Sequence, residues 1–123
     1  MNPFAAISKE RILLSTENFV VIKDQYPVSP GHCLIVSKSH VKTFFDLSFE
    51  EQKELITIIP KVRTWIEENH HPDGYNIGMN CGKTAGQSVM HFHCHVIPRY
   101  SGDMENPKGG IRHCIPEKGW YQA

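Results

Sequence analysis

The sequence predicts an α+β domain in which one main helix and a shorter helical piece accompany a five-stranded antiparallel sheet. Two observations predict this fold. Apolar residues recur at helical spacing between residues 48 and 69, and five short apolar runs bounded by turn-forming residues flank that stretch. Long connections and one dominant helix favour α+β over a regular alternation of strands and helices. The 123 residues suffice for a single domain, 1–123, with one modest core.

Three strands are expected before the helix. Residues 11–16 and 19–23 are apolar runs separated by a Glu-Asn pair, which is typical of a hairpin. Residues 24–31 contain two prolines and a glycine and should form a loop, and residues 32–37 are the next apolar run. A sheet of this size leaves an exposed edge, which a second subunit could cover.

The main helix is predicted to begin at Ser48, because Glu51 three positions later completes a capping box. It should end near Asn69, since a proline and a glycine follow shortly afterwards. Pro60 removes one backbone hydrogen bond and should kink the helix or divide it. The stripe expected to face the core consists of Leu55, Ile58, Ile59, Val62, Trp65 and Ile66.

Two further strands are expected at residues 75–80 and 90–97. The second contains His91, His93 and His95 at every second position. Because alternate side chains of a strand share one face, the three imidazoles should project the same way, roughly 6.6 Å apart at their bases. Such a row supplies nucleophiles, acids, bases or metal ligands near neutral pH.

Residues 80–89, directly before the histidines, form a short polar loop rich in glycine. Backbone N–H groups in such loops bind anions such as phosphate. The combination favours chemistry on a phosphate group. A metal site built on the histidine row and a purely structural row are the alternatives.

Residues 86–99 read GQSVMHFHCHVIPR, and residues 30–36 read PGHCLIV. Together they resemble the histidine triad (HIT) superfamily, whose signature is His-φ-His-φ-His-φ-φ with φ apolar. The resemblance extends over nearly the whole chain. It implies a homodimer with a sheet extended across the two subunits, and a nucleotide substrate. It also implies attack on the α-phosphorus through a covalent nucleotidyl-histidine intermediate.

The resemblance also implies a role for each site residue. His93 is the nucleophile, and His95 contacts the α-phosphate and the bridging oxygen and helps to protonate the leaving group. His91 orients His93 and connects to His32. Asp24 binds the ribose hydroxyls. The remaining positions implied to bind substrate are His32, Asn80, Gln87 and Ser88.

These assignments have plainer alternatives. His32 could be a strand residue satisfied by a backbone carbonyl, and Asp24 could merely start a loop. Gln87 and Ser88 could hold a tight turn. The attack itself requires no metal, no metal ligands are assigned, and Mg²⁺ is expected only as a companion of a polyphosphate substrate.

The tail distinguishes between branches of the superfamily. Residues 99–112 resemble the tail of bacterial HIT hydrolases of the fragile-histidine-triad branch, which implies a dinucleoside polyphosphate substrate such as diadenosine tri- or tetraphosphate. A nucleoside phosphoramidate hydrolase is the alternative enzyme, although that branch usually ends sooner after the triad. A slow-turnover nucleotide-binding regulatory module is the non-enzymatic alternative, and binding alone would not need His93.

Composition excludes several partner classes. Thirteen basic and thirteen acidic residues give no net charge, so neither nucleic acid nor a membrane surface is an expected partner. No apolar run approaches the roughly 20 residues of a membrane span, and the first residues do not resemble a secretion signal. The four cysteines form no Cys-x-x-Cys pair and are expected to be reduced in a cytoplasmic protein. A zinc site combining them with His40 or His113 is a minor alternative.

Overall fold

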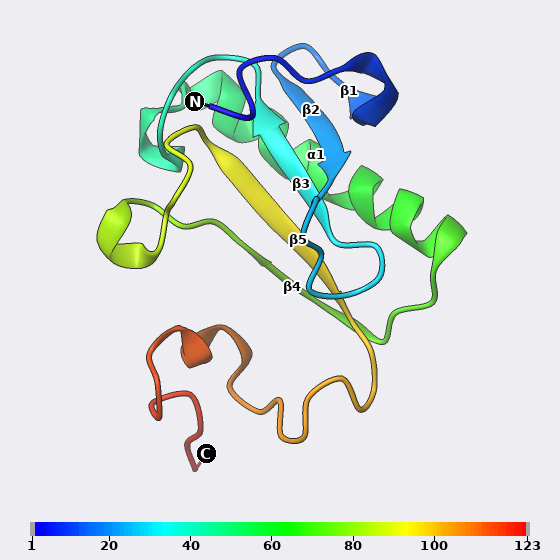
Figure 1. The fold of residues 1–123 in the computed structure, drawn as a ribbon, viewed down its shortest axis with the longest axis vertical. Coiled ribbons are helices and arrows are strands. Elements are labelled where there is room, and N and C mark those ends of the chain that lie inside the picture. Colours follow the sequence, from blue (N-terminus) through cyan, green and yellow to red (C-terminus); the bar gives the residue numbers. More distant parts are fainter. Residues whose placement is uncertain (1, 123) are drawn as a thin grey trace.

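The computed structural model describes residues 2–122 and confirms the α+β fold with a five-stranded sheet (Figure 1). Neighbouring strands pair antiparallel in the order β1-β2-β3-β5-β4. The elements are β1 (Ile12–Ser15), β2 (Phe19–Lys23), β3 (Cys33–Ser37), α1 (Phe49–Asn69), β4 (Gly74–Gly78) and β5 (His93–Arg99).

The boundary of β5 changes the expected arrangement of the histidines. The strand begins at His93, so the prediction that all three histidines lie on one strand is wrong for His91. The chain diverges from the ladder before β5 because the N–H of Phe92 donates to the carbonyl of Val41 in the loop after β3, at 2.7 Å. His91 therefore lies outside β5, and its ring bonds to the carbonyl of Ser37 at the end of β3.

Helix α1 begins as predicted. Ser48 Oγ accepts from the N–H of Glu51 at 3.1 Å, and Glu51 Oε1 accepts from the N–H of Ser48 at 2.8 Å. The helix continues through Pro60 as one element, so the alternative of a division into two helices does not occur. No helix within residues 2–122 has the length and apolarity needed to cross a bilayer. The shorter helical pieces are the 3-10 helices η1 (Lys9–Arg11), η2 (Phe44–Asp46), η3 (Lys83–Ala85) and η4 (Gly110–Cys114).

The main core lies between α1 and one face of the sheet. Four fully buried residues of the predicted stripe, Leu55, Ile58, Val62 and Ile66, pack against inward side chains of β2, β3 and β5. Cys33 and Cys94 belong to this core, and burial raises the pKa of both thiols to about 11. All four cysteines are free, as expected.

A smaller apolar cluster covers part of the other face. It consists of Val20, Ile22, Leu34 and Val36, with Phe4, Ile7 and Ile12 packed against it. Because β3 lies between two clusters, its side chains are buried on both faces. In β5, His93 pairs opposite Val36 and His95 opposite Leu34, which places both imidazoles on the face of the smaller cluster.

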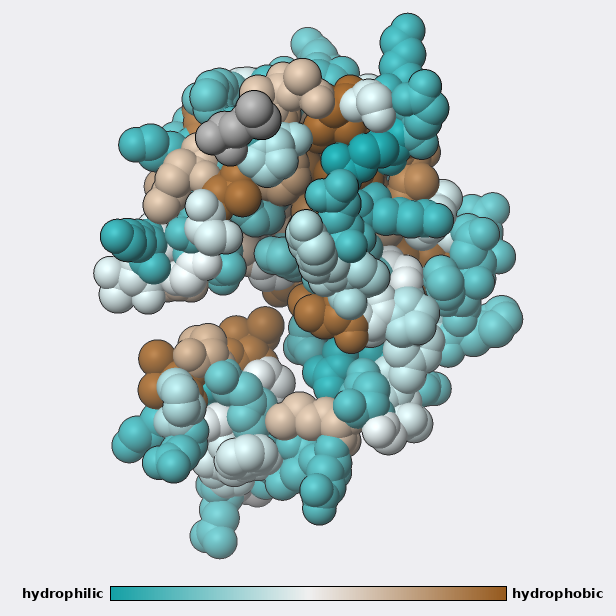
Figure 2. All heavy atoms as spheres, viewed as in Figure 1, coloured by the Kyte–Doolittle hydropathy of each residue, from teal (hydrophilic) through white to brown (hydrophobic). Residues whose placement is uncertain are grey.

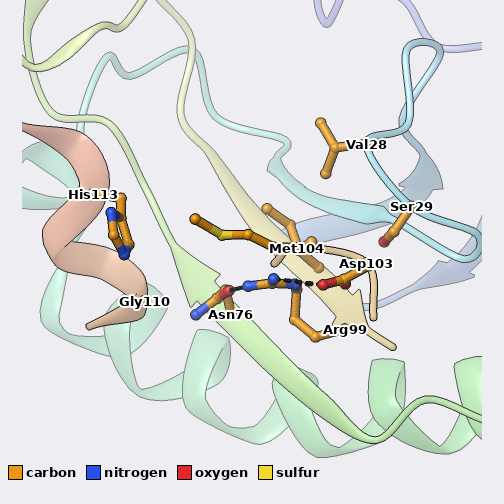
Figure 3. A pocket seen from close by; sticks show the side chains of 9 residues that line it. Val28, Ser29, Asn76, Arg99, Asp103, Met104, Gly110 and His113 are labelled. Atoms are coloured by element: carbon orange, nitrogen blue, oxygen red, sulfur yellow. Dashed lines mark hydrogen bonds and ion pairs between the residues drawn. The ribbon is translucent and has the colours of Figure 1, made fainter. Parts of the chain in front are cut away.

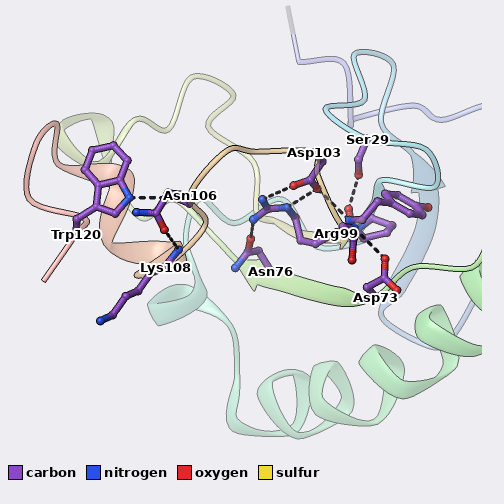
Figure 4. Close-up of polar contacts among 11 residues, drawn as sticks. Ser29, Asp73, Asn76, Arg99, Asp103, Asn106, Lys108 and Trp120 are labelled. Atoms are coloured by element: carbon purple, nitrogen blue, oxygen red, sulfur yellow. Dashed lines mark hydrogen bonds and ion pairs between the residues drawn. The ribbon is translucent and has the colours of Figure 1, made fainter. Parts of the chain in front are cut away.

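The chain beyond β5 folds largely on itself. The guanidinium of Arg99 donates to both carboxylate oxygens of Asp103 and to Asn76, and the indole N–H of Trp120 donates to the carbonyl of Asn106 at 3.0 Å (Figure 4). Figures 1 and 2 show that the last residues form a small lobe beside the sheet, with an open gap on one side, while Ile111 of the lobe reaches Gly78 of β4. The tail therefore adds little to the main core.

Candidate active site

A cleft of about 440 Å³ opens on the face of the sheet that carries His93 and His95. Strand β5 supplies these two histidines, and the turn between β2 and β3 supplies Asp24 and His32. The segment before β1 supplies Phe4. The cleft is lined by Pro3, Phe4, Arg11, Asp24, Gln25, Tyr26, Val28, His32, Leu34, Asn80, Ser88, Val89, His93 and His95.

The hydrogen bond made by His93 determines which of its ring nitrogens can react. Nδ1 lies 2.8 Å from the backbone carbonyl of His91. A carbonyl only accepts, so Nδ1 carries the proton and Nε2 carries the lone pair in the neutral ring. Within residues 2–122, no hydrogen bond engages that Nε2. His93 therefore presents a nucleophilic nitrogen.

The hydrogen bonds of His95 give its neutral ring the opposite tautomer to that of His93. The N–H of Val28 donates to Nδ1 of His32 at 3.2 Å, so neutral His32 carries its proton on Nε2. That Nε2 lies 2.9 Å from Nδ1 of His95 and must donate to it. Neutral His95 therefore carries its own proton on Nε2. With ring centroids 5.3 Å apart, an acceptor nitrogen on His93 stands beside a donor nitrogen on His95.

Burial determines the charge of the two hydrogen-bonded histidines, His32 and His95. Desolvation, together with the nearby His32 and His93, lowers the pKa of His95 to about 4, against the opposing effect of Asp24. Desolvation also lowers the pKa of His32. In the absence of substrate, both imidazoles are therefore neutral at pH 7. An anion bound in the cleft would favour the charged form of His95.

Asp24 lies beside the two histidines. One carboxylate oxygen is 3.4 Å from Nε2 of His32 and 3.9 Å from Nδ1 of His95, and the other accepts from the N–H of Tyr26. The three side chains each offer one possible metal-ligand atom, and these atoms lie within 4.8 Å of one another, so this group could hold a metal ion. Binding one would replace the hydrogen bond between His32 and His95. No cysteine belongs to such a cluster within the described chain.

His91 does not line the cleft. Its side chain is buried, with Nε2 donating to the carbonyl of Ser37 at 2.7 Å and Nδ1 facing the carboxamide of Asn2 at 2.9 Å. The expected connection to His32 is not formed, because both ring nitrogens of His91 bond elsewhere, to Ser37 and Asn2; His95 makes the contact with His32 instead. His91 contacts His93 through its backbone carbonyl.

The loop before the histidines contributes two of its three expected residues. Asn80 and Ser88 line the cleft, whereas Gln87 does not. The Gln87 amide accepts from the N–H of Gly82 at 2.8 Å and donates to the carbonyls of Lys42 and Val89. Since these bonds occupy both ends of the amide, the structure favours the alternative in which Gln87 holds the loop.

Sequence reasoning missed several residues of the cleft, and Phe4 and Arg11 are the two that bear most on its chemistry. The Phe4 ring lies 5.0 Å from that of His93, and Arg11 brings a cation to the cleft. Neither residue belongs to a motif, and both lie more than eighty positions from His93 and His95 in the sequence. Only the folded chain brings them together.

A second hollow of about 320 Å³ lies farther along β5 (Figure 3). Its charged side chains are already satisfied, since Arg99 bonds to Asp103 and Asn76. The ring of His113 faces the carbonyl of Lys108 at 2.9 Å. This hollow is lined by a single histidine and therefore lacks the pair of adjacent imidazoles that the histidine cleft presents.

Comparison with known proteins agrees with this geometry. The family model for the HIT domain matches residues 6–102. A bis(5'-adenosyl)-triphosphatase of Dictyostelium discoideum is 36% identical over 100 residues, which cover 81% of this chain and 67% of that protein. An AP-4-A phosphorylase of Mycobacterium tuberculosis is 39% identical over 79 residues, which cover 63% of this chain and 40% of that protein.

A solved structure supports the same relationship. A HIT family protein from Bacillus anthracis superimposes with a TM-score of 0.71 at 34% identity, covering 75% of this chain and 65% of that chain. This chain thus spans about two thirds or less of several of the relatives that it matches. With its fold, its histidine cleft and the match over residues 6–102, the chain belongs to the HIT domain family.

Proposed function

We propose that the protein is a nucleotide hydrolase or transferase that attacks an α-phosphate through a covalent nucleotidyl-His93 intermediate. The observation that carries this proposal is the pair of adjacent imidazoles with opposite roles: a lone pair on Nε2 of His93 and a proton on Nε2 of His95. Covalent transfer needs a nucleophile and a proton donor on the same phosphate. A site that only binds nucleotides needs neither.

In the first displacement, the Nε2 lone pair of His93 forms a bond to the α-phosphorus while the bond from phosphorus to the leaving group breaks. The bound anion favours uptake of a proton from solvent at Nδ1 of His95, where it takes the place of the hydrogen bond from His32. The resulting imidazolium gives its Nε2 proton to the departing oxygen or nitrogen. His95 is then neutral. The carbonyl of His91 accepts the Nδ1–H of His93 and disperses the positive charge that develops on its ring.

In the second displacement, water forms the new P–O bond and gives a proton to the neutral His95. The P–N bond breaks, and its electron pair returns to Nε2 of His93. Release of the nucleoside monophosphate and of one proton restores the starting state. These steps require no metal; Mg²⁺ could enter with a polyphosphate as part of the substrate.

Other residues of the cleft bind the rest of the nucleotide in this proposal. Asp24 accepts hydrogen bonds from the ribose hydroxyls, and Asn80 and Ser88 contact the phosphates or the leaving group. Arg11, which the sequence did not predict in the cleft, supplies a positively charged guanidinium suited to a polyphosphate. This charge, and the names of two relatives, support a dinucleoside polyphosphate as the substrate.

A direct comparison of substrates tests the proposal. Diadenosine triphosphate, diadenosine tetraphosphate and adenosine phosphoramidate should be assayed with one preparation, with and without a chelator. We expect the highest kcat/KM on a dinucleoside polyphosphate, with adenosine monophosphate among the products, and phosphoramidate turnover that survives chelation. A preference for the phosphoramidate would favour the alternative enzyme. Activity lost on chelation and restored by one zinc per subunit would contradict the metal-free mechanism.

We also propose that the protein is a homodimer in which two copies meet at β4. This strand forms the end of the sheet and pairs only with β5, so its outer edge is open within the described chain. Ile77 on β4 and Ile111 on the tail are exposed, and Ile111 reaches the side of Gly78. Trp65, which the sequence predicts in the core-facing stripe, packs partly against the chain's own core.

Light scattering at micromolar concentration should give about twice the chain mass of 14.1 kDa. Ile77→Arg should shift the equilibrium toward the monomer by burying a charge at the joint. Ser15→Arg places the same charge on β1, at the opposite end of the sheet, and should leave the dimer intact. A wild-type monomer, or equal effects of the two variants, would contradict this interface.

A further inference from the structure

The segment before β1 contributes a residue that joins two histidines. The side-chain amide nitrogen of Asn2 lies 2.9 Å from Nδ1 of His91 and 3.0 Å from Nε2 of His40. His40 stacks on His91 with ring centroids 5.1 Å apart. No sequence pattern connects these three residues, and Asn2 precedes the stretch matched by the family model.

Donor and acceptor roles in this group are consistent throughout. Nε2 of His91 must carry a proton, because it bonds to the carbonyl of Ser37 at 2.7 Å. Nδ1 of neutral His91 is therefore an acceptor, and the Asn2 amide has two N–H groups, one for His91 and one for His40. The oxygen of the same amide accepts from the N–H of Phe4 at 2.9 Å. Both ends of the carboxamide are thus engaged.

The same group reaches His93 by two routes. The first passes through the backbone, because the carbonyl of His91 holds Nδ1 of His93 at 2.8 Å. The second passes through Phe4, whose ring lies 5.0 Å from the His93 ring and whose N–H is fixed by Asn2. Asn2 does not line the cleft, and its side chain makes no hydrogen bond to His93 within the described chain. It can therefore act on His93 only through its neighbours His91 and Phe4.

We propose that Asn2 is a positioning residue for His93: its carboxamide acts with the carbonyl of Ser37 to hold His91 as the neutral Nε2–H ring, and it holds Phe4 on the His93 ring. Without it, the buried Nδ1 of His91 has no donor. The ring can then turn or take up a proton, and the carbonyl that sets the tautomer of His93 loses its fixed place. Angular errors of this kind lower the rate of a covalent step more than they weaken binding.

The effect on turnover rests on the proposed function; the effect on tautomers does not. In Asn2→Ala we expect kcat on the best nucleotide substrate to fall by about 10- to 100-fold, with KM changed by less than about threefold. Asn2→Gln keeps the carboxamide and should recover part of the loss. Asn106→Ala removes a hydrogen bond of the same type, in which the side-chain oxygen accepts from the N–H two residues later, and should leave kcat unchanged.

Nitrogen-15 chemical shifts of the histidine rings give a readout independent of turnover. Wild-type His91 should show a protonated Nε2 and an unprotonated Nδ1, and Asn2→Ala should show a mixture. Asn2→Asp replaces the donor by an acceptor, so His91 should become an imidazolium that faces the introduced carboxylate and the neighbouring rings of His40 and His93. An inactive wild type with these shifts would leave the positioning role intact and refute the proposed function alone.

Two results would overturn the proposal. One is an unchanged His91 tautomer in both Asn2→Ala and Asn2→Asp. The other is an equal loss of kcat in Asn2→Ala and Asn106→Ala, which would indicate a general loss of folded protein. Thermal unfolding of each variant identifies the second case.

Discussion

His93→Ala should abolish turnover while leaving nucleotide affinity within about threefold of the wild type. In the proposed mechanism this ring supplies the only atom that becomes bonded to phosphorus, whereas binding rests on Asp24, Arg11 and the walls of the cleft. Removing a covalent nucleophile typically costs four to six orders of magnitude in kcat, roughly the range seen in other covalent enzymes. Single-turnover assays and calorimetric titration with a nonhydrolysable nucleotide measure the two quantities separately.

The same position permits a positive control. In His93→Gly, added imidazole can occupy the vacated space, attack the α-phosphorus and leave as a nucleotidyl-imidazole, which restores the first displacement. His71→Ala, at an exposed histidine after α1, should behave as the wild type. Quenching the wild-type reaction with alkali and detergent should trap nucleotide on one histidine, because the P–N bond of a nucleotidyl-histidine breaks in acid and is more stable in base. Activity near the wild-type level in His93→Ala would refute the covalent mechanism.

Much of the fold follows from local patterns in the sequence. The capping box at Ser48 and Glu51 and the apolar stripe define α1, and the alternation of Cys94 and Val96 with His93 and His95 defines the two faces of β5. Pro60 was a weaker guide, because the apolar contacts on both sides of it keep the helix continuous. Periodicity predicts an element well when burial along its whole length agrees with it.

The site was predicted less completely, and the reasons are physical. Strand periodicity places His93 and His95 correctly but fails at His91, where a hydrogen bond to the loop after β3 overrides it. Gln87 is turned into its own loop by bonds that no local pattern reveals. Asn2 enters through contacts across nearly ninety residues of sequence, which only tertiary packing creates.

Replacing His95 should have an effect that depends on the leaving group. In His95→Ala, kcat on adenosine phosphoramidate should fall by roughly 10²- to 10³-fold, because the departing amine needs a proton and general acid catalysis typically supplies a factor of this size. The 4-nitrophenyl ester of adenosine monophosphate should lose much less, since 4-nitrophenolate departs as a stable anion. The ratio of the two kcat values is the measured quantity.

This ratio separates a proton donor from a residue that merely shapes the cleft. A positioning or binding role would slow both substrates alike, because both must reach the same Nε2 of His93. The neighbouring pair offers a graded test: His32→Ala removes the donor that holds Nδ1 of His95 and should shift the ratio in the same direction by a smaller factor. Equal losses of kcat on both substrates in His95→Ala would contradict a proton-donor role for His95. Water would then protonate the leaving group, and His95 would only bind the α-phosphate.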